Sequence, residues 1–293
     1  MFRGLSAFPI TPATADGRID TESLQRLLTR LVGAGVDSIG LLGSTGAYPF
    51  FSREERLRAV SAAVECVAGR VELLVGVGAL RTDAAVALAS DAKAAGADAG
   101  LLAPVSYTPL LDDEVLEHFR AVAAPELPLC IYNNPGTTHF DVSPELAGRL
   151  ADVPGVVAIK TGAPATGAAE MVQAVRSRVP SGFSVGFSVD WNAPAALLAG
   201  GDAWYSVVAG IYPKVFLQLA RAAMSGDAAE TRRLHEQLEP IWHLSRTYSS
   251  FRVVHLAASR AGIANAVPPL PILPLSGAAA NEVERVLEEL DLA

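Results

Sequence analysis

The feature that most constrains this chain is a regular alternation of short apolar runs with alanine- and leucine-rich helical stretches. The runs, in order, are GLSAFPI, SIGLLG, VELLVGVG, AGLLAPV, LPLCIYNN, VVAIKTG, FSVGFSV and AWYSVVAG, and each precedes a stretch of helical composition. Parallel strands that are covered by helices on both faces are typically continuous apolar runs. Eight strand–helix pairs therefore predict an α/β fold, a closed (β/α)8 TIM barrel. An open, doubly wound sheet is the alternative arrangement.

Helix signals divide the chain into two units. Thr21, Ser52 and Ser143 precede helical stretches and are expected as N-caps, and glycines recur where helices give way to strands. After about residue 224 the chain reads as helical, interrupted by the proline-rich turn VPPLPILPLSG. We therefore predict a barrel carrying the active site in residues 1–224, and a C-terminal helical extension packed on the barrel in residues 225–293.

Composition argues against several classes of function. The formal net charge of −8 leaves no basic surface for nucleic acid or an anionic membrane. No uninterrupted apolar stretch reaches the roughly 18 residues of a membrane span, and the N-terminus lacks the apolar core of a signal peptide. The two cysteines, Cys66 and Cys130, form no CxxC motif, so a disulfide framework is not indicated. A cytoplasmic protein is expected.

The sequence carries no motif for a metal or a nucleotide. The five histidines form no HExxH motif or close ligand set, and the chain has neither a P-loop nor a GxGxxG segment. We therefore predict chemistry that side chains carry alone, without a metal or an organic cofactor.

Lys160 is the residue that points to a particular chemistry. It is one of only three lysines, with Lys93 and Lys214, and it lies inside the apolar run VVAIKTG. Burying an ammonium group without a partner is costly, and apolar surroundings favour the neutral amine, which is a nucleophile. The alternative is a strand-end lysine whose amine extends to solvent.

Besides Lys160 at the end of the sixth run, two polar segments end strands of the predicted barrel, and the active site of such a fold lies at these strand ends. GSTGAY (43–48) ends the second run and YNNPGTT (132–138) ends the fifth. Adjacent strands lie about 4.8 Å apart, so inward-facing Tyr132 and Lys160 are expected within reach of each other. Each segment alone is also an ordinary turn. Their order and their placement at strand ends favour a site.

This set of residues suits Schiff-base catalysis. An uncharged lysine amine attacks a ketone, and the resulting iminium withdraws electrons while the adjacent carbon–carbon bond forms or breaks. Tyr132 can carry protons between the carbinolamine and the substrate. Ser44 and Thr45 supply hydroxyls for a substrate carboxylate. The backbone amides around Gly43 and Gly46 supply further donors for it.

The three motifs GSTG, YNNPG and the lysine of AIK, in this order, resemble the dihydrodipicolinate synthase / N-acetylneuraminate lyase family. The resemblance extends from AFPITP near the start, through SREER, to the helical C-terminus. It implies a class I, pyruvate-handling aldolase or lyase on a (β/α)8 barrel with a C-terminal helical region, usually a tetramer built as a dimer of dimers. By this likeness Lys160 forms the Schiff base and Tyr132 is the proton shuttle. Ser44 and Thr45 contact the pyruvate carboxylate, and Thr45 joins the predicted catalytic residues.

The chain departs from the family pattern around the second substrate. The family's lysine-pathway synthases have an arginine for the carboxylate of aspartate semialdehyde, and this chain has Thr137, which supplies neither charge nor fork geometry. Ser106 replaces the second tyrosine of the family's pair after the fourth strand, and Tyr107 follows one residue later. Ala47 and Thr161 stand where acidic residues are common. These departures favour a neutral, aromatic or sugar-acid-derived aldehyde.

Further candidates lie at the rim of the predicted barrel. The segment Tyr48-Pro49-Phe50-Phe51 is expected to be exposed, which also favours a neutral or aromatic partner. Gly186 and Ser188 compete as the equivalent of a family glycine after the seventh strand. The predicted substrate-binding residues are Ser44, Gly43, Gly46, Thr137, Tyr107, Ser106, His139, Gly186, Ser188 and Tyr205.

We therefore predict a Schiff-base-forming class I aldolase or lyase that acts on pyruvate or another 2-oxo acid and an aldehyde. Two alternatives stay open: a 4-hydroxy-tetrahydrodipicolinate synthase of lysine biosynthesis, and a non-catalytic homologue that binds a 2-oxo acid. The expected partners are small-molecule substrates and further copies of the chain, as a dimer or a tetramer. Neither nucleic acid nor a membrane is expected as a partner.

Overall fold

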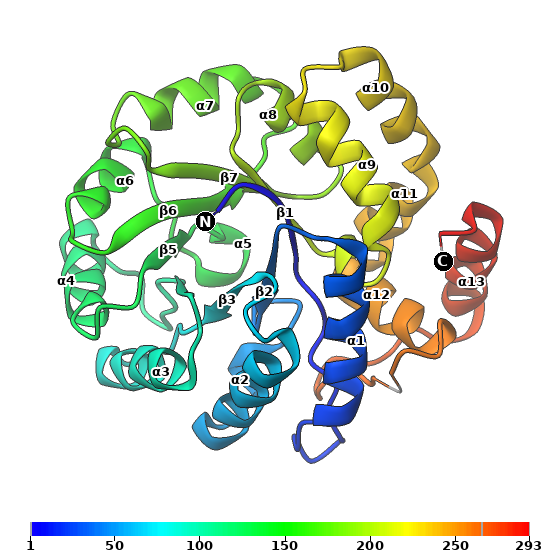
Figure 1. Ribbon diagram of the computed structural model, residues 1–293, viewed down its shortest axis with the longest axis horizontal. Coiled ribbons are helices and arrows are strands. Elements are labelled where there is room, and N and C mark those ends of the chain that lie inside the picture. The colour runs from blue at the N-terminus through cyan, green and yellow to red at the C-terminus, as the bar shows by residue number, and fades with distance from the viewer. Residues whose placement is uncertain (1, 265, 293) are drawn as a thin grey trace.

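The computed structural model describes residues 2–264 and 266–292, and its eight parallel strands close into a barrel (Figure 1). Each strand pairs with the next along the chain, and the last pairs with the first. The strands are β1 (Gly4–Ala7), β2 (Ser38–Leu41), β3 (Glu72–Gly76), β4 (Ala99–Leu102), β5 (Leu129–Tyr132), β6 (Val156–Gly162), β7 (Ser184–Ser188) and β8 (Ala203–Ser206). Every predicted run contains a strand, so the closed barrel is confirmed and the open sheet is wrong.

A ring of helices covers the outside of the barrel (Figure 1). The α-helices are α1 (Thr21–Ala34), α2 (Arg53–Val67), α3 (Thr82–Ala95), α4 (Asp112–Ala123), α5 (Pro135–Thr138), α6 (Pro144–Ala151), α7 (Ala168–Arg176), α8 (Ala193–Leu198) and α9 (Pro213–Met224). Two 3-10 turns, η1 (Tyr48–Phe50) and η2 (Val208–Gly210), follow β2 and β8.

Ser52 and Ser143 cap α2 and α6 as predicted, because their side chains accept backbone N–H groups of the first helical turn. The cap of α1 is Asp20, whose carboxylate accepts the N–H of Ser23. The predicted cap at Thr21 is therefore wrong by one residue. A carboxylate at this position also interacts favourably with the positive end of the helix dipole.

Four helices follow the barrel and lie along one side of it (Figure 1). They are α10 (Ala228–Gln237), α11 (Glu239–Tyr248), α12 (Ser250–Arg260) and α13 (Gly277–Leu290). α10 contacts α9 and α8, and α12 contacts η2, so this C-terminal extension packs on the barrel. The division into two units at residue 224, where α9 ends, stays a prediction. Across the described residues, every helix is too short or too polar to cross a lipid bilayer.

Three aspartates join neighbouring strands at the amino ends of the barrel strands. Asp37, Asp98 and Asp202 end the segments AGVD, AGAD and AGGD, directly before β2, β4 and β8. Their carboxylates accept backbone N–H groups of an adjacent strand, 2.7 Å from Leu5, 2.7 Å from Leu73 and 2.9 Å from Val185. This repeated contact satisfies donors at the ends of the strand ladders.

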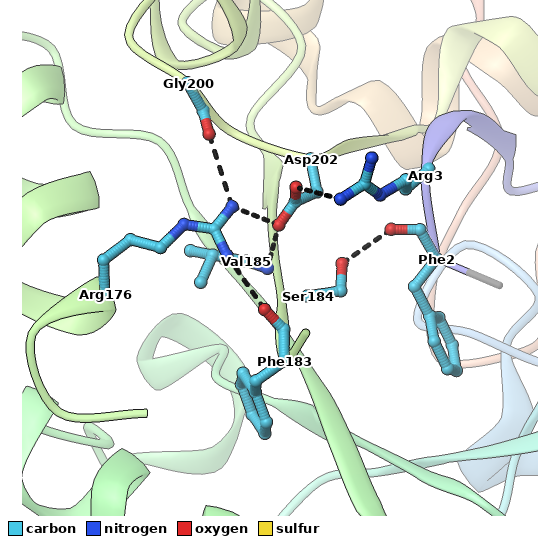
Figure 2. A network of polar contacts seen from close by, with 8 residues as sticks. All are labelled: Phe2, Arg3, Arg176, Phe183, Ser184, Val185, Gly200 and Asp202. Atoms are coloured by element: carbon cyan, nitrogen blue, oxygen red, sulfur yellow. Dashed lines mark hydrogen bonds and ion pairs between the residues drawn. The ribbon is translucent and has the colours of Figure 1, made fainter. Parts of the chain in front are cut away.

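Figure 2 shows the contacts around Asp202. The guanidinium of Arg176 donates to the Asp202 carboxylate, and Arg3 Nη2 lies 3.8 Å from its second oxygen. Nearby, the Ser184 hydroxyl donates to the Phe2 carbonyl at 2.6 Å, and the Phe2 ring is buried in the barrel interior. The network ties α7, β7, β8 and the N-terminal segment together.

We expect Asp202→Ala to destabilise the protein by about 2–4 kcal/mol, because it removes the carboxylate that neutralises the partly buried Arg176 guanidinium and leaves the Val185 N–H without its acceptor. Urea unfolding measures this change. Asp83→Ala is the matched control, since Asp83 and its partner Arg81 are 66% and 79% exposed and such pairs contribute about 0–1 kcal/mol. Equal losses in the two variants would contradict the structural role of Asp202.

His255 on α12 is a buried titratable group of the C-terminal extension. Its ring centroid lies 4.5 Å from that of Phe251, and its Nδ1 lies 3.4 Å from the Ala266 carbonyl oxygen. Burial lowers the pKa of His255 to about 4, from an ordinary value near 6.5. The folded protein therefore disfavours the imidazolium, and the unfolded chain binds this proton first as the pH falls.

The contribution of neutral His255 to the free energy of unfolding is fully present above about pH 6.5, and it is lost progressively as the pH falls toward 4. Between pH 7 and pH 5 we expect this group to account for about 2 kcal/mol of lost stability. His255→Leu should remove that part of the pH dependence in urea unfolding. His243→Gln, at an exposed position of α11, is the control and should leave it unchanged. Parallel pH curves for native protein and His255→Leu would refute the assignment.

Candidate active site

Lys160 lies in β6 with its amine inside the barrel. Its backbone is in register with Tyr132 of β5 on one side and with Gly186 of β7 on the other. The side chain is 3% exposed, so the alternative of an amine extending to solvent is wrong. Within the described part of the chain, Lys160 forms no ion pair with a carboxylate. The amine is thus a buried group without a counter-ion.

Tyr132 contacts Lys160 as the strand spacing predicts. The Lys160 Nζ lies 4.0 Å from the centroid of the Tyr132 ring. The phenol oxygen of Tyr132 lies 2.9 Å from Ser44 Oγ, so the second and fifth strand ends meet in one cluster. The structure therefore brings Lys160, Tyr132 and Ser44 together.

Asn134 completes this cluster and was not among the predicted site residues. Its Nδ2 donates to the Tyr132 hydroxyl at 2.9 Å and to Ser44 Oγ at 3.4 Å. Because the amide donates to the phenol oxygen, the phenol proton is free to be given to Ser44 or to a substrate. The only signal in the sequence is the position of Asn134, two residues after Tyr132 in YNNP.

The GSTG loop has the geometry of an anion site. Leu42 and Ala47, on either side of it, have left-handed φ angles of 54° and 53°. Among the described residues, no acceptor is bonded to the backbone N–H groups of Ser44, Thr45 and Gly46. Successive free amides in a tight loop form a concave site for an anion such as a carboxylate.

The glycines of this loop are required by crowding. A Cβ on Gly46 would lie 2.9 Å from the Leu42 Cα, and a Cβ on Gly43 would lie 2.7 Å from the Phe8 ring. Thr45, which lies between these glycines in the sequence, is buried. Its hydroxyl has no hydrogen bond to another described residue. Its contact with substrate stays a prediction.

Gly186 and Tyr205 lie in the barrel interior around Lys160. A Cβ on Gly186 would overlap the Tyr205 ring, whose centroid lies 6.0 Å from the Lys160 Nζ. The Tyr205 hydroxyl lies 3.8 Å from Cys130 Sγ, and burial raises the pKa of Tyr205 well above its ordinary value. Burial likewise raises the pKa of Cys130 to about 12. The amine therefore has apolar, uncharged neighbours.

The other predicted residues lie at the rim. Thr137 is exposed and donates to the Asn134 carbonyl at 3.2 Å, and His139 is exposed at the end of α5. Tyr107 is 98% exposed. The Ser106 hydroxyl donates to the Thr108 carbonyl, and that of Ser188 donates to the Thr161 carbonyl at 3.2 Å. No contact within the described chain brings these side chains to Lys160.

Tyr48 differs from its predicted exposure. Pro49 and Phe50 are exposed as predicted and Phe51 is half-buried, but Tyr48 is buried, with the Arg56 guanidinium 5.2 Å from its ring centroid. Burial raises the pKa of Tyr48 to about 12. It lines a cavity of about 720 Å³ between η1, α2 and α3, beside the barrel. The chemistry of Lys160 lies elsewhere, inside the barrel.

No described group of three or more His, Cys, Asp or Glu side chains is arranged to hold a metal ion. The barrel, the buried lysine and the neighbouring tyrosine define a class I aldolase-type lyase, which acts through a Schiff base on its own lysine. The chain belongs to the dihydrodipicolinate synthetase family, whose model matches residues 1–290. The predicted family is thereby confirmed.

Relatives match along almost the whole chain. A 4-hydroxy-tetrahydrodipicolinate synthase of Methylibium petroleiphilum is 37% identical over 284 residues, which cover 97% of this chain and 96% of the relative. The crystal structure of a dihydrodipicolinate synthase from Agrobacterium tumefaciens is 52% identical, with a TM-score of 0.97 and coverage of 99% and 98%. A pyruvate complex of the chloride-inhibited dihydrodipicolinate synthase from Acinetobacter baumannii is 28% identical, with a TM-score of 0.92 and full coverage of both chains (100% each).

Proposed function

We propose that Lys160 forms a Schiff base with pyruvate, or with another small 2-oxo acid, and that the enzyme then joins or cleaves the adjacent carbon–carbon bond with an aldehyde. The observation that carries this proposal is the buried Lys160 amine beside Tyr132, whose hydroxyl is held by Ser44 and Asn134. The pyruvate complex of the Acinetobacter baumannii relative supports the choice of oxo acid.

The steps follow from the placement of these groups. The Lys160 amine attacks the ketone carbon, a C–N bond forms, and the carbonyl oxygen takes a proton from Tyr132. Tyr132 takes back a proton from the attacking nitrogen and gives it to the carbinolamine hydroxyl, which leaves as water and so forms the iminium. The phenolate of Tyr132 then accepts a proton from the neighbouring methyl or methylene carbon. The resulting enamine attacks the aldehyde carbon, and the aldehyde oxygen takes a proton from Tyr132. Water then hydrolyses the product iminium, which restores the carbonyl group of the product and the Lys160 amine. Throughout, the free amides of the GSTG loop hold the oxo-acid carboxylate.

We further propose a neutral aldehyde as the second substrate. The support is the absence of charge at three positions: Thr137 carries a hydroxyl, Ala47 a methyl group, and Thr161 is buried beside Asn133. A second candidate is aspartate semialdehyde, because relatives that cover nearly the whole chain are named 4-hydroxy-tetrahydrodipicolinate synthase.

The test combines trapping with a substrate screen. The protein is incubated with pyruvate and borohydride, and intact-mass analysis with peptide mapping locates the adduct. A reduced pyruvyl group on Lys160 is expected, and its absence with pyruvate and with longer 2-oxo acids would overturn the proposal in favour of a non-catalytic binding protein. Steady-state kinetics with neutral, aromatic and sugar-acid-derived aldehydes follow. Aspartate semialdehyde as the best partner would overturn the neutral-aldehyde proposal.

We also propose that the protein is a homo-oligomer, a dimer or a tetramer, in the cytoplasm. Large apolar side chains are strongly exposed in the single chain: Tyr107 by 98%, Leu270 by 70%, Leu80 and Leu111 by 69% and Leu273 by 65%. Exposed apolar side chains that adjoin one another mark surfaces that contact another protein, and Leu270 and Leu273 lie close together in the chain. Free Cys66 and Cys130 suit a reducing compartment. Sedimentation velocity tests the assembly, and a monomer at micromolar concentration would contradict it.

A further inference from the structure

The ring of Phe8 lies against the amine of Lys160. Phe8 follows β1 directly, and its backbone N–H donates to the Ser206 carbonyl at 2.8 Å. The ring is 1% exposed and belongs to the barrel's inner core. The Lys160 Nζ lies 4.0 Å from the centroid of the Phe8 ring and 4.0 Å from that of the Tyr132 ring. The nitrogen is therefore in contact with two aromatic rings.

Glycines make the room that the Phe8 ring occupies. A Cβ on Gly40 of β2 would overlap the far edge of the ring, and a Cβ on Gly43 would lie 2.7 Å from its near edge. The ring also meets that of Tyr205 edge-on, with centroids 5.7 Å apart and an interplanar angle of 88°. Phe8 is thus held on several sides in one orientation.

An aromatic face has properties that suit this position. Its negative quadrupole attracts a cationic nitrogen within about 6 Å of the centroid, more strongly where water is excluded. It offers no strong acceptor that would compete for the amine's bonding to a substrate carbon. A carboxylate or carbonyl oxygen would also attract the cation, but it would hydrogen-bond the nitrogen and compete with the substrate carbon.

We propose that Phe8 is a positioning residue for Lys160: it holds the amine beside Tyr132 and stabilises the positive charge of the iminium nitrogen. This inference rests on the proposed Schiff-base function. When the iminium forms, the C–N bond becomes double, the C–O bond of the carbinolamine breaks, and the oxygen leaves as water with the proton it receives from Tyr132. The positive charge then resides on a nitrogen that keeps both aromatic neighbours.

The test measures the rate at which borohydride traps the pyruvyl adduct in Phe8→Leu. We expect the maximal rate at saturating pyruvate to fall roughly 10-fold or more, since a cation–π contact in a dry site is worth such a factor. The pyruvate concentration for half-maximal rate should stay within about twofold, because the carboxylate site in the GSTG loop is intact. If Phe8→Leu acted only by loosening the packing, both the maximal trapping rate and the pyruvate concentration for half-maximal rate would change.

Phe187→Leu is the matched control. Phe187 is fully buried in β7, the strand that pairs with the β6 strand of Lys160. It belongs to the outer core between barrel and helices and has no contact with the Lys160 amine. Its substitution costs similar packing energy, and the trapping rate should stay near the native value. Phe8→Met has about the same volume as Phe8→Leu but a longer, more flexible side chain that adapts to the cavity, and it replaces Phe8→Leu should the latter not fold.

Gly40→Ala provides a second, independent measurement. The added methyl group displaces the Phe8 ring, so the single variant should slow trapping. In the Phe8→Leu background the shorter side chain leaves space, and Gly40→Ala should add little further loss. Fully additive effects, or a native trapping rate in Phe8→Leu, would overturn the role of Phe8 while leaving the Schiff base established. Absence of any adduct in the native protein would instead overturn the proposed function, and this inference with it.

Discussion

Replacing Lys160 with alanine is expected to abolish both the pyruvate adduct and carbon–carbon bond turnover. No other described side chain offers an amine inside the barrel, because Lys93 lies on α3 and Lys214 on α9. The loss should be at least about 10³-fold, which is the scale on which removal of a covalent nucleophile acts. Lys160→Arg should behave in the same way, since a guanidinium keeps the charge but does not form the Schiff base.

Lys93→Ala is the control for this experiment. Lys93 is a half-exposed amine, bonded to the Pro125 carbonyl at 2.7 Å, and its removal should leave both adduct and turnover near native levels. Peptide mapping distinguishes the two sites directly. An adduct that persists in Lys160→Ala, mapped to Lys93 or Lys214, would show that the buried amine is not the nucleophile.

Tyr132→Phe is expected to lower turnover by about 10²–10⁴-fold, the range that a positioned proton carrier supplies. The ring that contacts Lys160 stays in place, so the fold and the borohydride adduct should survive, with the adduct forming more slowly. The substitution removes only the oxygen that binds Ser44 and Asn134. Steady-state and single-turnover kinetics check the result.

Two comparisons sharpen this second experiment. Tyr212→Phe, at a buried tyrosine at the start of α9, removes a hydroxyl outside the cluster and should leave turnover unchanged. Asn134→Ala should give a smaller loss than Tyr132→Phe, because Asn134 orients the phenol without exchanging the proton. Native turnover in Tyr132→Phe would show that water or another hydroxyl, and not Tyr132, carries the proton.

The predicted site and the folded site agree where spacing along strands decides the geometry. Lys160 and Tyr132 could be paired from the sequence because parallel strands of a closed barrel have one regular spacing, and both residues end apolar runs. The disagreements arise where contact depends on loops. Tyr48 was expected to be exposed, yet η1 folds its ring against Arg56, and no periodicity in the sequence carries that information.

Asn134 and Phe8 were missed for a related reason. An asparagine is ordinary in a turn, and a phenylalanine is ordinary in an apolar run. Their roles in the site depend on the atoms that they contact across the barrel. The Phe8 ring reaches Lys160 only because Gly40, distant in sequence, leaves space beside it. Such contacts join residues with no fixed separation along the chain.

By itself, the sequence determined the barrel, the family and the identity of the buried lysine, because strand and helix periodicity and the order of motifs are local properties of the chain. Only the tertiary structure decided what surrounds that lysine: two ring centroids at 4.0 Å from its nitrogen, and a tyrosine hydroxyl held by a serine and an asparagine. The physical reason is that closing the sheet brings distant strand ends and loops to one point, and side-chain packing there sets the contacts.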